Sequence, residues 1–148
     1  MNIRIANALD AGSLIEFNQA MALETEGKRL DPEKISSGVA AVFADEKKGF
    51  YVVAEDSGAI VGGLMVTYEW SDWRNGWFWW IQSVYICPEA RGQGLYTRMY
   101  QFVKERAAET GSVCGFRLYV ETENHHAQGV YDAVGMQRSH YIMYEEET

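Results

Sequence analysis

The sequence has few cysteines and histidines, and those present are not spaced for metal or disulfide chemistry. Only two cysteines occur among the 148 residues, Cys87 and Cys114, and they do not form a Cys-x-x-Cys pair. The three histidines lack the i, i+4 spacing that places two ligands on one helix face. We therefore expect neither a disulfide framework nor a bound metal.

Positive charge is also scarce. The chain has 13 Lys and Arg residues against 21 Asp and Glu residues, a formal net charge of −8, and its basic residues form no cluster. Because binding to a phosphate backbone depends on clustered Lys and Arg, a nucleic-acid partner is not expected.

Long apolar segments are missing as well. The apolar run from Trp77 to Ile81 has only five residues, whereas a transmembrane helix needs about 20. Residues Met1–Ile5 lack the basic and then apolar build of a secretion signal. The sequence thus predicts a cytoplasmic protein without a membrane partner.

The composition is nevertheless that of a folded protein. Hydrophobic residues make up 47% of the chain and aromatic residues 14%, which is enough for a packed core. A length of 148 residues corresponds to about one domain. We expect a single domain over residues 1–148.

Hydrophobic periodicity and turn signals predict the element order βααβββαβαβ. The predicted strands span residues 3–5, 50–55, 59–70, 77–87, 116–120 and 140–144, and the predicted helices span residues 10–27, 31–43, 95–111 and 124–134. Three successive strands indicate antiparallel pairing, and the later alternation of helices and strands indicates a mixed sheet. The predicted fold class is α/β.

A glycine-rich loop joins the predicted strand at 77–87 to the helix that follows it. Gly92 and Gly94 allow a tight backbone turn, and the first N–H groups of the helix, with its dipole, favour an anion. Arg91 adds a charge suited to phosphate oxygens. The loop therefore indicates phosphate or pyrophosphate binding, with a tight turn that binds nothing as the alternative.

Two other phosphate-binding loops do not fit this stretch. A Walker A loop ends in Gly-Lys-Ser/Thr, which is absent here. The dinucleotide fingerprint needs a third glycine at position 97, where this chain has Thr97, and it belongs to an early βαβ unit.

Two motifs in the sequence resemble those of the GNAT superfamily of acetyl-CoA-dependent N-acetyltransferases. The stretch Arg91-Gly92-Gln93-Gly94-Leu95-Tyr96 resembles the family's pyrophosphate loop, Arg/Gln-x-x-Gly-x-Gly/Ala. About thirty residues later, Asn124, Ala127, Tyr131 and Gly135 match the pattern Asn-x-x-Ala-x-x-x-Tyr-x-x-x-Gly. The resemblance spans nearly the whole chain and implies a single GNAT-like domain, with a mostly antiparallel twisted sheet and about four helices.

The resemblance also implies acetyl-CoA as the acetyl donor and assigns residues to it. The pyrophosphate would be held by backbone N–H groups of the loop beside Arg91, namely those of Gly92, Gln93, Gly94, Leu95, Tyr96 and Thr97. The pantetheine arm would pair with the backbone of Val84, Tyr85 and Ile86. Asn124 and Ala127 would lie at the cofactor, and Tyr131 would protonate the departing CoA thiolate.

The sequence departs from the family pattern at three positions. Tyr96 stands where the loop motif has Gly or Ala, and Gln82 and Tyr119 stand where relatives carry a catalytic glutamate on the fourth or fifth strand. Neither glutamine nor neutral tyrosine is a base at pH 7. Either another carboxylate acts through water, or the amine arrives deprotonated. The candidate carboxylates are Glu24, Glu69, Asp72 and Glu121.

Acidic and aromatic residues form the candidate acceptor site. Five tryptophans surround one predicted hairpin and would form core, a dimer surface or the wall of an acceptor pocket: Trp70, Trp73, Trp77, Trp79 and Trp80. Carboxylates near them would favour a cationic amine. The residues selected for the acceptor are Glu24, Glu69, Trp80, Gln82 and Tyr119.

The sequence therefore predicts direct transfer of acetyl from acetyl-CoA to a primary amine. A small amine or polyamine-like acceptor is favoured over a protein N-terminus or lysine, and the resemblance suggests a homodimer. One alternative is a catalytically silent, CoA-binding regulatory module. Another is an interaction domain that uses its tryptophan-rich surface and binds no cofactor.

Overall fold

The computed structural model describes all 148 residues, which form two compact units, residues 1–118 and residues 119–148. The first unit holds a five-stranded sheet and three long helices. The second unit holds α4 (His125–Ala133) and the C-terminal segment.

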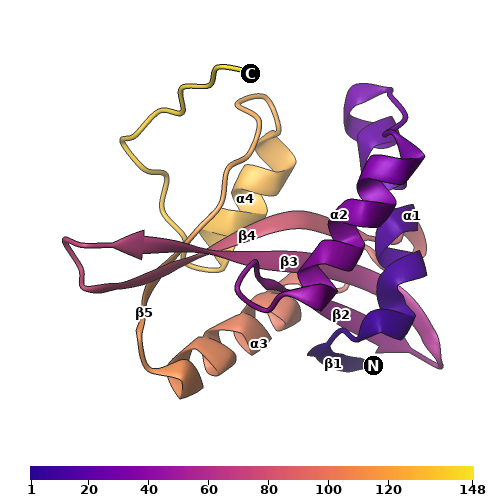
Figure 1. Cartoon of the computed structure of the whole chain (residues 1–148), viewed down its shortest axis with the longest axis horizontal. Coiled ribbons are helices and arrows are strands. Elements are labelled where there is room, and N and C mark those ends of the chain that lie inside the picture. The colour runs from indigo at the N-terminus through magenta and orange to yellow at the C-terminus, as the bar shows by residue number, and fades with distance from the viewer. The chain divides into compact units, whose positions relative to one another are not determined.

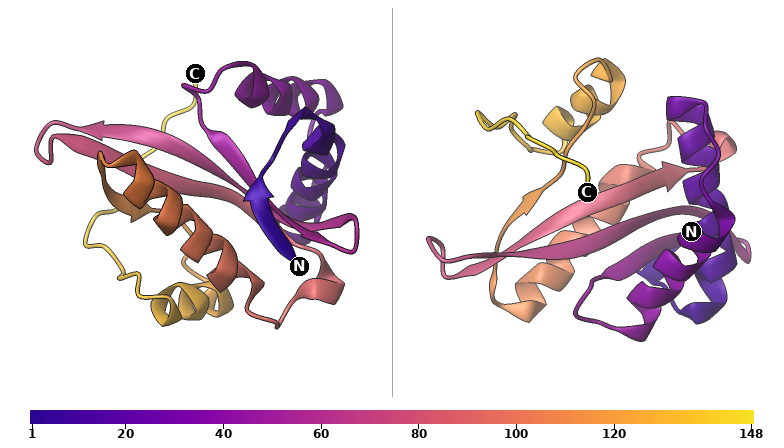
Figure 2. Two further views of the ribbon diagram at one scale, coloured as in Figure 1. Left: turned by 90° about the horizontal axis from the view of Figure 1, so that it is seen from below. Right: turned by 45° about the horizontal axis from the view of Figure 1, so that its top comes forward.

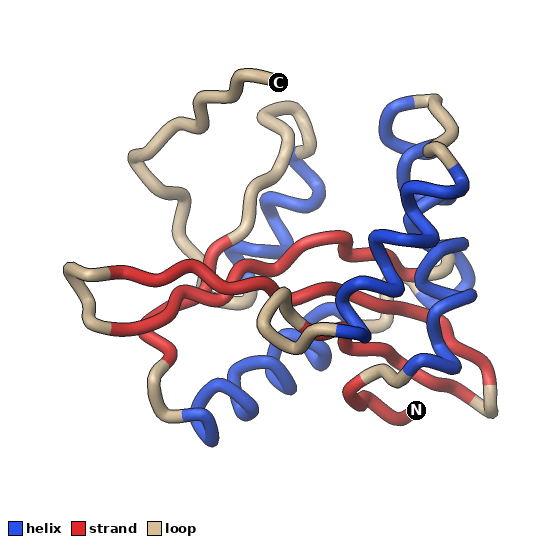
Figure 3. Tube along the Cα trace, in the orientation of Figure 1, coloured by secondary structure: helices blue, strands red, loops and turns tan.

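The sheet of the first unit has the strand order β1-β2-β3-β4-β5 (Figure 1). Its strands are β1 (Asn2–Ile5), β2 (Phe50–Asp56), β3 (Ala59–Ser71), β4 (Gly76–Ile86) and β5 (Val113–Arg117). The helices of this unit are α1 (Ala11–Glu26), α2 (Pro32–Ala44) and α3 (Leu95–Thr110), with the single-turn helices η1 (Ala8–Asp10) and η2 (Pro88–Ala90). Strands β1 to β4 pair antiparallel in succession, and β5 is parallel to β4. Figure 3 shows the strands in red and the helices in blue along the chain. The predicted mixed, mostly antiparallel sheet is confirmed.

Helices cover both faces of this sheet, with α1 and α2 on one face and α3 on the other (Figure 2). Alternate residues of β2 point to opposite faces, so Tyr51 and Val53 pack with Leu14 of α1 and Val39 of α2. On α3, Met99 is fully buried. None of the helices is both long enough and apolar enough to span a bilayer.

Two helix ends follow the signals in the sequence. The Asp31 side chain accepts the N–H groups of Glu33 and Lys34, and Pro32 occupies the first position of α2. Helix α1 ends at Gly27, which has a left-handed φ of 62°.

The observed β5 is displaced from the predicted strand. It spans Val113–Arg117 rather than residues 116–120, because its pairing with β4 begins at Trp77 and ends at Trp80. The ends of such a strand depend on its pairing partner, which lies far away in the sequence. Local periodicity therefore cannot predict them.

No strand forms at residues 140–144, where the alternating apolar pattern predicts one. The segment is irregular, and its large side chains are exposed, including Ile142 (80%) and Tyr144 (88%). An alternating pattern indicates only that the side chains of a segment would fit a pleated, half-buried surface. A strand also needs a hydrogen-bonded neighbour, which this segment lacks.

An ion network ties β1 to η1 and β2. Arg4 donates to both carboxylate oxygens of Asp10, at 2.8 and 3.0 Å, and to Glu55 at 3.2 Å. Asp10 is only 5% exposed, and its Oδ2 also accepts the N–H of Asn7 at 2.9 Å. The hydrogen bonds from Arg4 lower the pKa of Asp10, although burial opposes them.

Replacing Asp10 with asparagine is expected to lower the free energy of unfolding at neutral pH by about 1.5–3 kcal/mol, the range for a charged hydrogen bond. The folded-state pKa of Asp10 lies below its unfolded value of about 4, so this contribution is present above that pH and is lost as pH falls through the folded-state pKa. Wild type and variant should therefore converge in strong acid. Urea unfolding between pH 7 and pH 2 measures this, with the exposed Asp132→Asn as the control. A difference that stays constant with pH would contradict it.

Candidate functional site

The edge of β4 that faces β5 is unpaired over half of the strand. Because β5 pairs only with Trp77–Trp80, no strand pairs with this side of β4 from Ile81 to Ile86. The register between β3 and β4 shifts in this region, and Ser83, next to Val84, has a positive φ of 53°, which marks a β-bulge. We call residues 81–86 on this side the unpaired edge. An extended ligand could add to it as a further strand.

Ile86 directs its backbone toward the unpaired edge. The next residue, Cys87, donates its N–H to the Val61 carbonyl on the β3 side at 2.9 Å, and successive residues of a strand direct their backbone groups to opposite sides. The Ile86 carbonyl accordingly accepts Nε–H of Arg91, at 2.8 Å. By the same alternation the backbone of Tyr85 faces β3, so Ile86 fits the predicted pantetheine pairing and Tyr85 does not.

The loop between η2 and α3 contains backbone donors without acceptors. Gly92 and Gly94 have φ values of 76° and 73°, in the region that favours glycine. The N–H groups of Gly92, Gln93 and Gly94 make no hydrogen bond within the chain, and no side chain caps α3, which begins at Leu95. Thr97 lies in the first turn of α3, and its side chain is exposed. Because the first amides of a helix lack intrahelical acceptors, the loop has the donors that a pyrophosphate requires.

The bulky residue of the loop motif, Tyr96, is buried, with 6% of its surface exposed. Its ring stacks on that of Tyr100 one turn later, with centroids 6.0 Å apart and planes 9° apart. Tyr100 in turn meets Phe116 of β5 edge-on at 5.7 Å. The Tyr96 ring is thus held on the part of α3 that meets β5, which is compatible with anion binding at the loop.

Arg91, the first residue of the loop motif, is paired with a carboxylate of α1. Its Nη2 donates to both oxygens of Glu24, at 3.0 and 3.3 Å. The Tyr85 hydroxyl donates to the same carboxylate at 3.2 Å, and the Arg91 guanidinium lies 5.4 Å from the Tyr85 ring centroid. Burial and then the charge of Glu24 raise the pKa of Tyr85, which keeps its hydroxyl protonated. A predicted cofactor residue and a predicted acceptor residue are therefore in contact.

Five side chains on one face of the sheet form a second polar group, which we call the polar row: Thr67 and Glu69 of β3, Trp80 and Gln82 of β4, and Arg117 of β5. Oε1 of Glu69 accepts Nε1–H of Trp80 at 2.8 Å and Nη1–H of Arg117 at 2.9 Å. Gln82 donates from Nε2 to the Thr67 hydroxyl at 2.5 Å. Oε2 of Glu69 accepts no hydrogen bond within the chain. Three of the predicted acceptor residues are thus brought together.

Sequence reasoning missed Arg117 and Thr67. Arg117 lies 48 residues from Glu69 along the chain, and only the parallel register of β4 and β5 places it opposite Trp80. Its guanidinium also lies 3.6 Å from the centroid of the Phe78 ring. A single arginine in a predicted strand does not indicate that it will contact Glu69 and Phe78.

The tryptophans of the β3–β4 hairpin divide between the interior and the surface. Trp79 is buried, whereas Trp70 and Trp77 are 49% and 39% exposed and meet edge-on at 5.0 Å. Trp73 at the tip is 91% exposed. Only Trp80 belongs to the polar row, so the five residues do not share one role.

The second sequence motif lies in the second unit. Asn124 is the N-cap of α4, and its Oδ1 accepts the N–H of Ala127 at 3.1 Å. The spacing of these two residues therefore serves helix capping. Tyr131 on α4 is half-buried, and burial raises its pKa. Tyr119 begins this unit and is 61% exposed.

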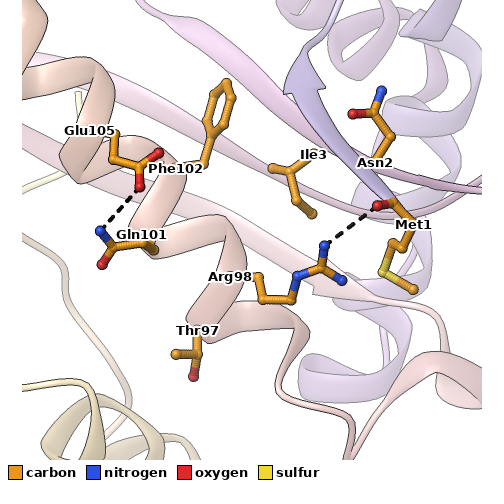
Figure 4. Close-up of a pocket in the computed structure, with 8 residues that line it drawn as sticks. All are labelled: Met1, Asn2, Ile3, Thr97, Arg98, Gln101, Phe102 and Glu105. Carbon is orange, nitrogen blue, oxygen red and sulfur yellow. Dashed lines mark hydrogen bonds between the residues drawn. The ribbon is translucent and has the colours of Figure 1, made fainter.

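A separate hollow of about 520 Å³ lies between β1 and the first half of α3 (Figure 4). It is lined by Met1, Asn2, Ile3, Thr97, Arg98, Gln101, Phe102 and Glu105. Arg98 donates to the Met1 carbonyl at 3.4 Å, and Gln101 donates to Glu105 at 3.3 Å. Of the predicted site residues, Thr97 alone lines this hollow.

The remaining titratable groups offer little further chemistry. No three His, Cys, Asp or Glu side chains are grouped so that they could hold a metal ion. Burial, followed by the charge of Glu89, raises the pKa of Cys87, which therefore remains a thiol at neutral pH. The candidate bases Asp72 and Glu121 are exposed.

Known proteins resemble this chain in sequence over most of its length. The model of the Acetyltransferase (GNAT) family matches residues 14–136. A thialysine N-epsilon-acetyltransferase from Bos taurus is 31% identical over 146 residues, which cover 91% of this chain and 83% of that protein.

Solved structures agree with the family match. The crystal structure of a possible acetyltransferase from Clostridium difficile 630 is 42% identical, has a TM-score of 0.92, and is matched over 99% of this chain and 97% of that one. The crystal structure of a predicted acetyltransferase from Clostridium acetobutylicum, with acetyl-CoA, shares the fold at 18% identity and a TM-score of 0.80, over 98% and 95% of the two chains. With the unpaired edge, the glycine loop and the strand order in place, the chain belongs to the GNAT family of acetyltransferases.

Proposed function

We propose that the protein transfers the acetyl group of acetyl-CoA to a primary amine of a small cationic acceptor. The observation that carries this proposal is the unpaired edge of β4, together with the loop amides a few residues after it that have no acceptor. The backbone N–H of Ile86 would pair with an extended arm, and the amides of Gly92, Gln93 and Gly94 would bind the pyrophosphate. Acetyl-CoA supplies the acetyl group as a thioester.

The chain's own groups would then assist the transfer. A backbone N–H near the β-bulge at Ser83 would donate to the acetyl carbonyl oxygen and stabilise its developing negative charge. Tyr131 would donate its phenolic proton to the departing sulfur, and burial keeps that hydroxyl protonated. Because Cys87 remains a thiol, we propose that the amine attacks directly and that no acyl-enzyme forms.

The polar row supports a cationic amine as the acceptor. Oε2 of Glu69 can accept an N–H from an ammonium group, and Trp80 offers an aromatic surface beside it. The net charge of −8 favours the approach of cations. The relative from Bos taurus is named for acetylation of thialysine at its N-epsilon, which supports a small amine.

Glu69 is also the carboxylate we propose as the base, acting directly or through water. Arg117 and Trp80 hold only its Oε1, and its Oε2 accepts no hydrogen bond, whereas both oxygens of Glu24 accept hydrogen bonds from Arg91. Gln82, at the family's fourth-strand base position, is engaged with Thr67 and cannot take a proton. A homodimer and a cytoplasmic location complete this proposal.

Release of the CoA thiol across a panel of amines tests the proposal. The panel contains thialysine, linear diamines, polyamines, and peptides with a free N-terminus or a lysine. We expect the highest rates with small amines, since a single carboxylate beside one ring suits a small cation. Faster release with peptides would overturn the assignment of the acceptor.

The alternative function is a catalytically silent CoA-binding module, favoured by the glutamine at position 82. It predicts that CoA binds but that no amine in the panel stimulates thiol release. Calorimetric titration with CoA, made beside the panel, separates this outcome from a chain that binds no CoA.

A further inference from the structure

The contact between Glu24 and Arg91 links the last turn of α1 to the loop that the proposed function assigns to the pyrophosphate. Arg91 opens the pyrophosphate loop, and Glu24 lies in the last turn of α1. The two residues are 67 positions apart in the sequence, yet one guanidinium nitrogen reaches both carboxylate oxygens at 3.0 and 3.3 Å. The structure therefore holds the loop cation on a protein carboxylate.

This ion pair is of a kind that an anionic ligand can displace. The Arg91 and Glu24 side chains are 47% and 43% exposed, and half-exposed pairs contribute little to stability. The amides of Gly92, Gln93 and Gly94, which have no acceptor, lie directly after Arg91. A pyrophosphate on those amides would bring more negative charge to Arg91 than one carboxylate does.

Two neighbouring hydrogen bonds would remain after such a displacement. Nε of Arg91 is anchored to the Ile86 carbonyl, so the guanidinium can turn without leaving the end of β4. The Tyr85 hydroxyl would continue to donate to Glu24.

We propose that Glu24 is an internal competitor for the cofactor: Arg91 exchanges the Glu24 carboxylate for an oxygen of the pyrophosphate when CoA binds. This inference rests on the proposed function, because it takes the loop as the pyrophosphate site. Before CoA arrives, Glu24 holds Arg91 in place beside the loop. After the exchange, Glu24 keeps Tyr85 as its hydrogen-bond donor and loses its cation. Glu24 is thus a positioning residue that acts through Arg91.

Calorimetric titration of CoA into four variants and the wild type tests the exchange. Glu24→Gln removes the competing charge and should tighten CoA binding about two- to five-fold, the range for a half-exposed ion pair. Glu26→Gln is the matched control, because Glu26 carries the same charge two residues away and its nearest cation is Lys28 rather than Arg91. It should leave the dissociation constant unchanged.

A double-mutant cycle then separates the exchange from a general loss of negative charge. Arg91→Gln places in the loop the other residue that the motif allows, so the loop should fold and bind CoA more weakly. In this background, Glu24→Gln should have no effect on CoA affinity, since no cation remains for Glu24 to hold.

Each outcome has a distinct meaning. Equal CoA affinity of wild type, Glu24→Gln and Glu26→Gln would overturn the exchange while leaving the cofactor site intact. An equal gain from Glu24→Gln with and without Arg91 would also overturn it, because the effect would then be one of charge alone. No CoA binding by the wild type would overturn the proposed function itself. A crystal structure with CoA should place the Arg91 guanidinium on the pyrophosphate, and an intact Glu24–Arg91 pair in that complex would contradict the exchange.

Discussion

Replacement of Tyr131 with phenylalanine is expected to slow release of the CoA thiol by at least about 10-fold, since a positioned general acid typically contributes about 10²- to 10⁴-fold. The variant keeps the aromatic ring of Tyr131 and removes only its hydroxyl. Burial raises the pKa of Tyr131, so the proton is present throughout the neutral range. The loss should appear in kcat, measured with a thiol reagent at saturating acetyl-CoA and amine, and CoA affinity should stay unchanged.

Tyr144→Phe is the matched control for that experiment. Tyr144 lies in the irregular C-terminal segment and is 88% exposed, so the same loss of a hydroxyl should not alter the rate. Equal rates for Tyr131→Phe and wild type would remove Tyr131 from the mechanism and leave the acetyltransferase assignment standing.

Replacement of Gly94 with valine is expected to weaken CoA binding at least about 10-fold. Gly94 has a φ of 73° at the N-cap of α3, a conformation that a β-branched residue adopts only with strain. Relief of that strain would turn the amides of the loop away from the pyrophosphate. The loss of one charged hydrogen bond costs about 1.5–3 kcal/mol, which corresponds to roughly ten-fold or more in affinity. Calorimetric titration with CoA measures the change.

Gly58→Val separates loss of the site from loss of stability. Gly58 has a φ of 84° in the turn between β2 and β3, and a Cβ there would meet no atom within 4 Å. It should therefore reproduce the backbone strain of Gly94→Val, seen as a lower melting temperature, without weakening CoA binding. If both variants bound CoA like wild type, the loop would not be the pyrophosphate site.

The loop and the helix ends could be predicted from the sequence because their signals are local. Glycine in a tight turn and an aspartate followed by proline at a helix start behave alike in most proteins. Here Gly94 has a positive φ before α3, and Asp31 caps α2. The order of the first five strands follows from periodicity and from turn residues for the same reason.

The contacts that define the polar row and the Arg91 pair could not be predicted in this way. Glu69 meets Arg117 across 48 residues, and Glu24 meets Arg91 across 67. These partners depend on the parallel register of β5 and on where α1 lies over the sheet, and each is a property of the whole fold. The strand predicted at residues 140–144 is wrong for the same reason. Hydrophobic alternation shows that a segment could fit into a sheet, but it does not show that a neighbouring strand is present.

The unpaired edge of β4 has a consequence for the protein in the absence of its substrate. A strand edge with open N–H and C=O groups is a template for another chain, and β4 is rich in aromatic residues of high β propensity. Two molecules could join at this edge into a continuous sheet, which is the first step of aggregation. A bound donor arm would cover the same groups. The concentration of the bound donor would then also determine how long the protein stays in solution before it aggregates.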